Sequence, residues 1–217
     1  MKSTISSLFL TLVAMLFLSV AAFSNSITLD FTSTGSNIVN GVYAYPYYFS
    51  ILDSTGTKTV KTDFPLMCDD YTDHIAVGDI WKANELSIDD AATANYMDAG
   101  HPGTYHMAAW LFSQLTPTNA IDVNSAIWDL FTGGSVPLSS NGATLLSDAS
   151  GHLTYENPQI MFYTPFGYTH GGAGAPQEFI GDPVATPEPS LALMMITGTA
   201  LFGLSRLVSK TFGRKRT

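Results

Sequence analysis

One short run of residues carries side chains suited to nucleophilic catalysis or to metal binding. It extends from Cys68 to His74 and contains three carboxylates, those of Asp69, Asp70 and Asp73. A neighbouring imidazole can take the proton of a thiol and leave a nucleophilic thiolate. Nearby carboxylates act in the opposite direction, because their negative charge raises the pKa of the thiol. The run therefore favours a buried Cys68 that ends a strand before an acidic turn, over a Cys–His nucleophile.

The same carboxylates are candidate ligands for a hard cation. Ca²⁺ binds about six to eight oxygen atoms, and Asp69, Asp70 and Asp73 would supply some of them. An acidic exported domain without disulfides can also gain folding energy from a bound ion. The spacing differs from that of the EF-hand loop, which needs a central glycine and a closing glutamate. Calcium is thus the one cofactor that the sequence suggests.

The remaining histidines and acids do not match a catalytic pattern. His101 and His106 are five residues apart, a spacing that turns their rings away from each other on a helix. Nothing in the sequence fixes the separation of Asp129 and Glu156, as a glycosidase pair would require. The chain also has no HExxH, GxSxG, P-loop or paired-cysteine motif. We expect no catalytic residue and a protein that is not an enzyme.

Two short segments resemble the thioester domains of bacterial surface adhesins. They are LMC at residues 66–68 and NSAIW at residues 124–128. In that family a cysteine and the glutamine of a TQxA motif form an internal thioester, which captures nucleophiles of the host. The resemblance makes Cys68 the sulfur donor and puts Asn124 where glutamine is expected. Asparagine is one methylene shorter and has no preceding threonine here, so the resemblance implies a related fold rather than a working bond. Alternatively, Trp128 is simply the aromatic anchor of an amphipathic helix.

Charge is distributed unevenly along the chain. The formal net charge is -9, and all 18 acidic residues lie between Asp30 and Glu188. Within that segment the only basic residues are Lys58, Lys61 and Lys82. Such an acidic body repels a phosphate backbone, so we expect no nucleic-acid partner. The single cysteine excludes an intrachain disulfide.

Residues 1–24 have the composition of a secretory signal peptide. A basic start at Lys2 is followed by an apolar stretch over residues 8–20 and then by small residues. Signal peptidase would cleave after Ala22 or Ser24. An uncleaved membrane anchor is the alternative, but the apolar run is short for that role. The sequence therefore predicts export.

The other end of the chain predicts a membrane helix over about residues 191–208. Residues 191–204 are apolar and uncharged, so the helix would nearly cross a hydrocarbon core ~30 Å thick. Basic residues flank membrane helices on the cytoplasmic side, which would leave everything before Pro187 outside, in agreement with the signal peptide. The basic residues of this end are Arg206, Lys210, Arg214, Lys215 and Arg216.

The order of features at this end resembles the PEP-CTERM sorting signal of Gram-negative exopolysaccharide producers. Pro187, Glu188 and Pro189 form a stiff, extended tripeptide, and the apolar helix and basic cluster follow within residues 186–217. The resemblance implies that an exosortase, a membrane-embedded cysteine transpeptidase, processes the chain. The product would then reach the cell surface, the outer membrane or the extracellular matrix. The family's setting implies a structural or binding role linked to exopolysaccharide or biofilm.

Between these two ends, residues 25–165 have the patterns of one mainly β domain. Aromatic or alternating apolar residues predict several strands, and Pro46 indicates an edge strand or a bend. We expect a sandwich or small barrel with two short packed helices. The predicted strands cover residues 26–31, 41–52, 66–68, 74–77, 79–83 and 159–163.

Helical periodicity appears in the middle of this domain. Apolar residues recur at helical spacing over about residues 105–115 and 122–131, and Gly133 ends the second helix. A further turn or two is expected at residues 91–97. Two other segments lack such periodicity. Residues 134–151 are rich in Ser, Gly and Asn and predict loops, and residues 166–185 are Gly- and Pro-rich and predict a linker.

Overall fold

The computed structural model describes residues 25–53 and 55–184 of the chain. The predicted signal peptide, the sorting motif Pro187-Glu188-Pro189 and the basic residues after it lie outside the described residues. The chain divides into two units, Met1–Pro183 and Val184–Thr217, and the description below concerns the first. Within the described ranges, every helix is too short or too polar to cross a membrane.

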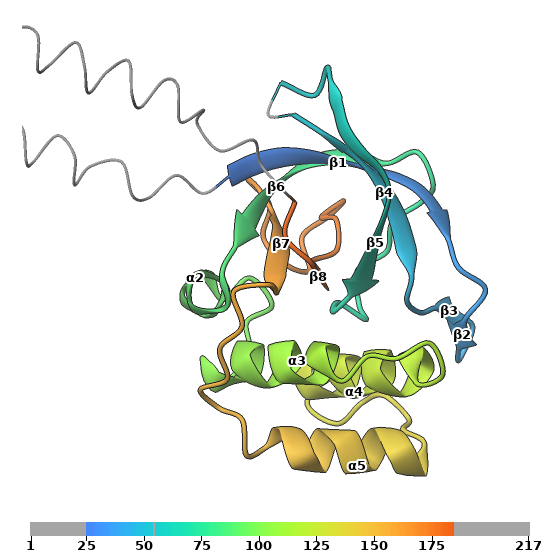
Figure 1. Ribbon diagram of the computed structural model, residues 1–217, viewed down its shortest axis with the longest axis vertical. Coiled ribbons are helices and arrows are strands. Elements are labelled where there is room, and N and C mark those ends of the chain that lie inside the picture. Colours follow the sequence, from blue (N-terminus) through green and yellow to red (C-terminus); the bar gives the residue numbers. More distant parts are fainter. Residues whose placement is uncertain (1–24, 54, 185–217) are drawn as a thin grey trace, which may run out of the picture. The chain divides into compact units, whose positions relative to one another are not determined.

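Six antiparallel strands close into a barrel, so of the two expected folds the small barrel is the one observed (Figure 1). Each strand pairs with two neighbours, and the pairing of β6 with β1 completes the ring. Going round the barrel, the strands are β1 (Asn25–Thr34), β4 (Tyr47–Leu52), β5 (Thr59–Cys68), β8 (Phe179–Gly181), β7 (Met161–Pro165) and β6 (Ile80–Leu86). A small ribbon of β2 (Ile38–Val39) and β3 (Val42–Tyr43) lies in the connection between β1 and β4.

Aromatic rings fill the interior of the barrel. Alternate residues of a strand point to opposite faces, and in β4 fully buried residues alternate with partly buried ones. The ring of Phe49 on β4 lies 5.3 Å from that of Phe31 on β1. It also contacts Trp81 on β6 at 5.8 Å and Phe179 on β8 at 4.9 Å, both edge to face. One side chain thus packs against three other strands, which explains why an aromatic-rich sequence closes a barrel.

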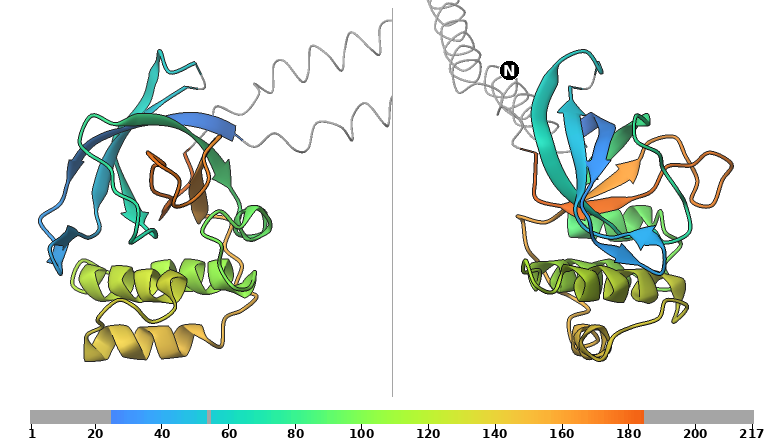
Figure 2. Two further views of the ribbon diagram at one scale, coloured as in Figure 1. Left: turned by 180° about the vertical axis from the view of Figure 1, so that it is seen from behind. Right: turned by 90° about the vertical axis from the view of Figure 1, so that its right-hand side faces the viewer.

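Among the described residues, four helices accompany the barrel. The predicted pair is present as α3 (Gly103–Ser113) and α4 (Ala120–Thr132), and Gly133 ends α4 in a left-handed conformation with φ 66°. The turn or two expected at residues 91–97 overlaps α2 (Ile88–Ala94), and α5 (Ser140–Ala149) is additional. Both views of Figure 2 show α3 and α4 across one end of the barrel, with α5 on their far side.

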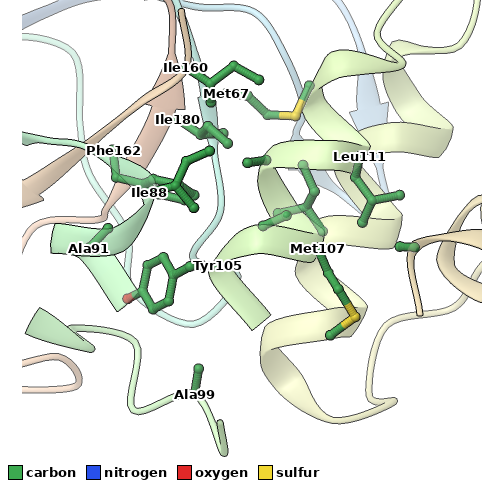
Figure 3. Packing of buried hydrophobic residues seen from close by; sticks show 14 of the residues in the cluster. Met67, Ile88, Ala91, Ala99, Tyr105, Met107, Leu111, Ile160, Phe162 and Ile180 are labelled. Atoms are coloured by element: carbon green, nitrogen blue, oxygen red, sulfur yellow. The ribbon is translucent and has the colours of Figure 1, made fainter. Parts of the chain in front are cut away.

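A second apolar core joins the helices to the barrel end (Figure 3). Tyr105 of α3 is fully buried there, and its ring meets Phe162 of β7 edge to face at 5.0 Å. Burying one large apolar side chain stabilises a fold by roughly 1.5–3 kcal/mol, so this core fixes the helices against the barrel. Other members of the core are Met67, Ile88, Met107, Leu111, Ile160 and Ile180.

The loop predicted over residues 134–151 is wrong, because much of this segment forms α5. Ser139 caps the helix: its Oγ accepts a hydrogen bond from the N–H of Gly142 at 2.9 Å and donates to Asp122 Oδ1 at 2.5 Å. Ala149 at the other end is fully buried. Packing against α3 and α4 therefore outweighs the low helix propensity of the Ser, Gly and Asn residues.

The strand predicted at residues 74–77 is also wrong. These residues belong to the loop that follows β5, and β5 itself starts at Thr59, well before the predicted segment 66–68. The carboxylate of Asp70 shapes the loop, since its Oδ1 accepts the N–H groups of Thr72 at 2.9 Å and Asp73 at 3.1 Å. Aspartates commonly stabilise turns in this way, at the expense of strand pairing.

The folded unit continues beyond Pro165, contrary to the linker expected over residues 166–185. Within that segment β8 pairs with β5 on one side and with β7 on the other, and so fills the last gap of the barrel. Residues 166–178 form the loop between β7 and β8. This correction adds a strand and a long loop to the predicted domain.

Candidate functional site

The structure brings together Cys68 and Asn124, the two residues that carry the resemblance to thioester domains. Cys68 ends β5, and Asn124 is fully buried near the start of α4. The amide nitrogen of Asn124 donates to the carbonyl oxygen of Cys68 at 2.7 Å. Its amide oxygen accepts the backbone N–H of Tyr45 at 2.7 Å. One side chain therefore ties a helix to a barrel strand and to the segment that precedes β4.

The Cys68 thiol is buried and protonated. Its sulfur is fully inaccessible and donates to the carbonyl oxygen of Asp70 at 2.8 Å. Burial, followed by the charges of Asp70 and Asp69, raises the pKa of this thiol well above its usual range. His74, the base that the sequence offered for it, is exposed. The site lacks the thiolate that nucleophilic chemistry would need at neutral pH.

Next to Cys68 lies a buried pair of carboxyl groups, Asp69 and Glu178. Neither residue is exposed to solvent. Glu178 accepts hydrogen bonds from the hydroxyl groups of Tyr105 at 3.1 Å and Thr164 at 2.5 Å. Burial raises the pKa of Glu178 to about 7, and burial together with the charge of Glu178 raises the pKa of Asp69 well above its usual range. The pair therefore holds a proton at neutral pH.

Sequence reasoning missed Glu178, because the residue lies in the segment expected to be a linker. The only local signal was the apolar pair Phe179-Ile180, which stands out in a Gly- and Pro-rich stretch. Asp69 is one of the predicted cation ligands, but the group of possible metal ligands found among the described residues contains Asp70 and Asp73 without it.

Those two aspartates meet a histidine, and we call the three residues the Asp–His group. Asp70, Asp73 and His170 each offer one ligand atom, and these atoms all lie within 4.8 Å of one another, as in a group that could hold a metal ion. Nε2 of His170 lies 3.4 Å from Oδ1 of Asp70. His170 comes from the loop between β7 and β8, far from the aspartates in sequence, so the run 68–74 alone could not reveal it.

A second group of one histidine and two carboxylates combines the buried His106 with two exposed acids. His106 Nε2 is 3.5 Å from Asp89, and Nδ1 is 3.5 Å from Glu156 and 2.9 Å from the carbonyl oxygen of Tyr155. The two carboxylate side chains are 73% and 62% exposed, so water already solvates them. Asp129 lies apart from this group and accepts the N–H of Val136 at 2.9 Å. The contacts of His106 with its neighbours are therefore explained by a structural role.

Comparisons of the chain with protein-family models, with curated proteins and with solved structures gave no match.

Proposed function

We propose that this chain is an exported, non-catalytic surface protein with a structural or binding role linked to exopolysaccharide. The proposal that the protein is not a catalyst rests on the state of Cys68. The one nucleophile of the constellation singled out in the sequence is buried, protonated and hydrogen-bonded to the backbone. The side chain opposite it, Asn124, uses both ends of its amide for backbone contacts. These residues hold the helices to the barrel, which suits a scaffold better than an enzyme.

Export and sorting are supported by the sequence. The predicted signal peptide and the predicted basic flank of the C-terminal helix require the same orientation, with the acidic domain outside. The PEP tripeptide, apolar helix and basic cluster then supply the order of features that an exosortase substrate would have. A domain that does not depend on disulfides is compatible with this route, because its barrel and helix cores supply the stability.

A binding role is supported by aromatic side chains at the surface. Tyr43 on β3 is 48% exposed, and Phe166 and Tyr168 after β7 are 56% and 46% exposed. Aromatic rings that face solvent offer flat apolar faces, on which sugar rings can stack. Exopolysaccharide is therefore the ligand class that we propose for these exposed rings.

The first experiment is an intact-mass measurement of the protein from its native host after cell fractionation. We expect a species that starts near Phe23 or Asn25, ends within residues 187–190 and occurs in the medium or the outer layer. Replacing both Pro187 and Pro189 by alanine should leave the tail attached, whereas the matched change Pro183→Ala should not. A wild-type chain that retains residues 191–217 in the inner membrane would contradict the sorting proposal.

Covalent capture is the second candidate function, because the two residues of the thioester resemblance are in contact. The same mass measurement tests it, since forming a thioester between Cys68 and Asn124 would remove one ammonia from the chain. We expect no such loss, because the Asn124 amide would have to give up its bonds to Cys68 and Tyr45. A mass that is lower by one ammonia, with no thiol that can be labelled after unfolding, would instead favour the adhesin-like function.

A further inference from the structure

We propose that the Asp–His group, made up of Asp70, Asp73 and His170, binds a divalent transition-metal ion of the zinc type. The proposal goes beyond the function proposed above and does not depend on it. Its starting point is that two carboxylates from the loop after β5 and one histidine from the β7–β8 loop present ligand atoms within 4.8 Å of one another.

The first argument is an unsatisfied oxygen on a buried carboxylate. Asp70 is fully buried, and its Oδ1 takes three donors: the N–H of Thr72 at 2.9 Å, the hydroxyl of Thr72 at 2.9 Å and the N–H of Asp73 at 3.1 Å. Its Oδ2 is buried too but has no hydrogen-bond partner. A desolvated carboxylate oxygen without a donor destabilises a fold unless a cation compensates for it. A bound metal ion would do so.

The second argument is that hydrogen bonds between side chains and the backbone already hold the two loops together. Gln177 is buried, and its side-chain amide donates to the carbonyl oxygens of Asp70, at 3.0 Å, and Asp73. The N–H of Gly171 donates to Asp73 Oδ2 at 3.1 Å. The ligands are therefore positioned by contacts outside the group, and binding would need little rearrangement.

The third argument is a local excess of negative charge. Four carboxyl groups lie in this region, and their charges, after burial, raise the pKa of Tyr96 above its usual range. Of the described residues only three are lysine or arginine, and all three, Lys58, Lys61 and Lys82, are exposed. His170 is the one side chain for which an ion pair with Asp70 is found among the described residues. A divalent ion would balance charge that no lysine or arginine balances here.

The ligand types favour zinc over the calcium expected from the aspartates alone. Calcium takes oxygen ligands, whereas an imidazole nitrogen with carboxylates suits Zn²⁺ and its neighbours in the first transition row. Three protein ligands would leave a fourth position for water or for a donor atom from a bound molecule.

The test is zinc binding by the full chain, purified in detergent micelles and stripped with EDTA. We expect one zinc per chain after desalting, a higher melting temperature with Zn²⁺, and no comparable shift with Ca²⁺. His170→Ala and Asp73→Asn should each weaken zinc binding at least tenfold. Asp70 is not replaced, because its carboxylate also shapes the loop.

The matched control is His106→Ala, which removes the histidine of the second group and should leave zinc binding unchanged. Loss of binding in this variant, with binding kept in His170→Ala, would overturn the proposal. So would a wild-type chain that binds no zinc, or one that binds calcium whether or not His170 is present. Circular dichroism of the metal-free variants establishes that they are folded, and His170→Gln serves as a second variant if alanine disturbs the loop.

Discussion

Glu178 connects the barrel to the helical layer through its two carboxyl oxygens. One oxygen accepts the hydroxyl of Tyr105 on α3, and the other accepts the hydroxyl of Thr164 on β7. The hydroxyl of Tyr105 also accepts the N–H of Met97 at 3.0 Å, which extends the chain of hydrogen bonds to the segment between α2 and α3. A single buried acid thus lies at a junction of three parts of the fold.

The raised pKa of Glu178 predicts that the domain is less stable at higher pH. Burial places the folded pKa near 7, above the value of about 4.3 in an unfolded chain. Between these values the folded state holds a proton that the unfolded state has lost. The free energy of unfolding therefore falls as pH rises through this window, by an amount on the order of 3 kcal/mol. Urea denaturation at pH 5 and pH 8 with EDTA present measures the difference.

Glu178→Gln separates this effect from other titrating groups. The amide has nearly the same shape but cannot ionise, so we expect the variant to lose the part of the pH dependence that Glu178 contributes, while the buried Asp69, whose pKa is also raised, keeps a part of its own. Glu156→Gln is the matched control, because the Glu156 side chain is 62% exposed, and its stability should follow the wild-type profile. A profile for Glu178→Gln that keeps the full slope would show that another group is responsible.

At the scale of single elements, β8 is the shortest strand of the barrel, and a methyl group does not fit freely at its last residue, Gly181. A methyl group added to Gly181 would meet Leu66 Cδ2 at 2.5 Å and the carbonyl oxygen of Pro65 at 3.5 Å. The first distance is shorter than side chains tolerate, so either β8 or the side chain of Leu66 must move, whereas the second is an ordinary van der Waals contact. Leu66 is itself fully buried, so its side chain has little room to move away.

Gly181→Ala should destabilise the domain by about 1–3 kcal/mol, the usual result of overpacking a well-filled core. Thermal or urea unfolding measures this loss. Gly100→Ala is the control, because a methyl group there meets nothing within 4 Å. Equal stability of the two variants would mean that the contact between β8 and Leu66 relaxes without cost.

The elements that the sequence predicted well are those whose signal is local. The apolar spacing of α3 and α4 and the glycine after α4 gave their positions to within a few residues. Neither α5 nor β8 could be found in this way. The packing of α5 on two other helices outweighs the low helix propensity of its residues. The strand β8 forms because its backbone pairs with β5 on one side and β7 on the other.

The same difference between local and long-range signals applies to the candidate sites. Asp70 and Asp73 lie in one run, so their proximity could be predicted, whereas His170 reaches them only through the β7–β8 loop. The meeting of Cys68 and Asn124 was suggested by a family resemblance, because no periodicity joins the end of a strand to a helix so far along the chain. Long-range pairs of this kind depend on the closure of the barrel.

At the scale of the whole molecule, the barrel and the helical layer depend on the segment after Pro165. It provides β8, the buried Glu178 and Gln177, and the loop that carries His170. Without this segment β5 and β7 would have no partner between them, and two apolar cores would open.

A chain truncated after Pro165 should therefore fail to unfold cooperatively and should be cut rapidly by proteases. A chain truncated after Pro183 retains β8 and should keep the melting behaviour of the full-length protein. Circular dichroism melting and limited proteolysis of both chains test this expectation. If the shorter chain melted cooperatively, the barrel would not require β8, and the domain boundary expected from the sequence would stand.

The position of β8 also determines when the domain can fold during synthesis. It is the last strand of the barrel to be made, but it belongs between two strands made earlier. Until it emerges, β5 and β7 present unpaired edges, which other chains could join. Pairings between such distant segments also form slowly. The nascent chain therefore passes through a late, vulnerable interval, in which a chaperone or another binding partner would have the most time to act on it.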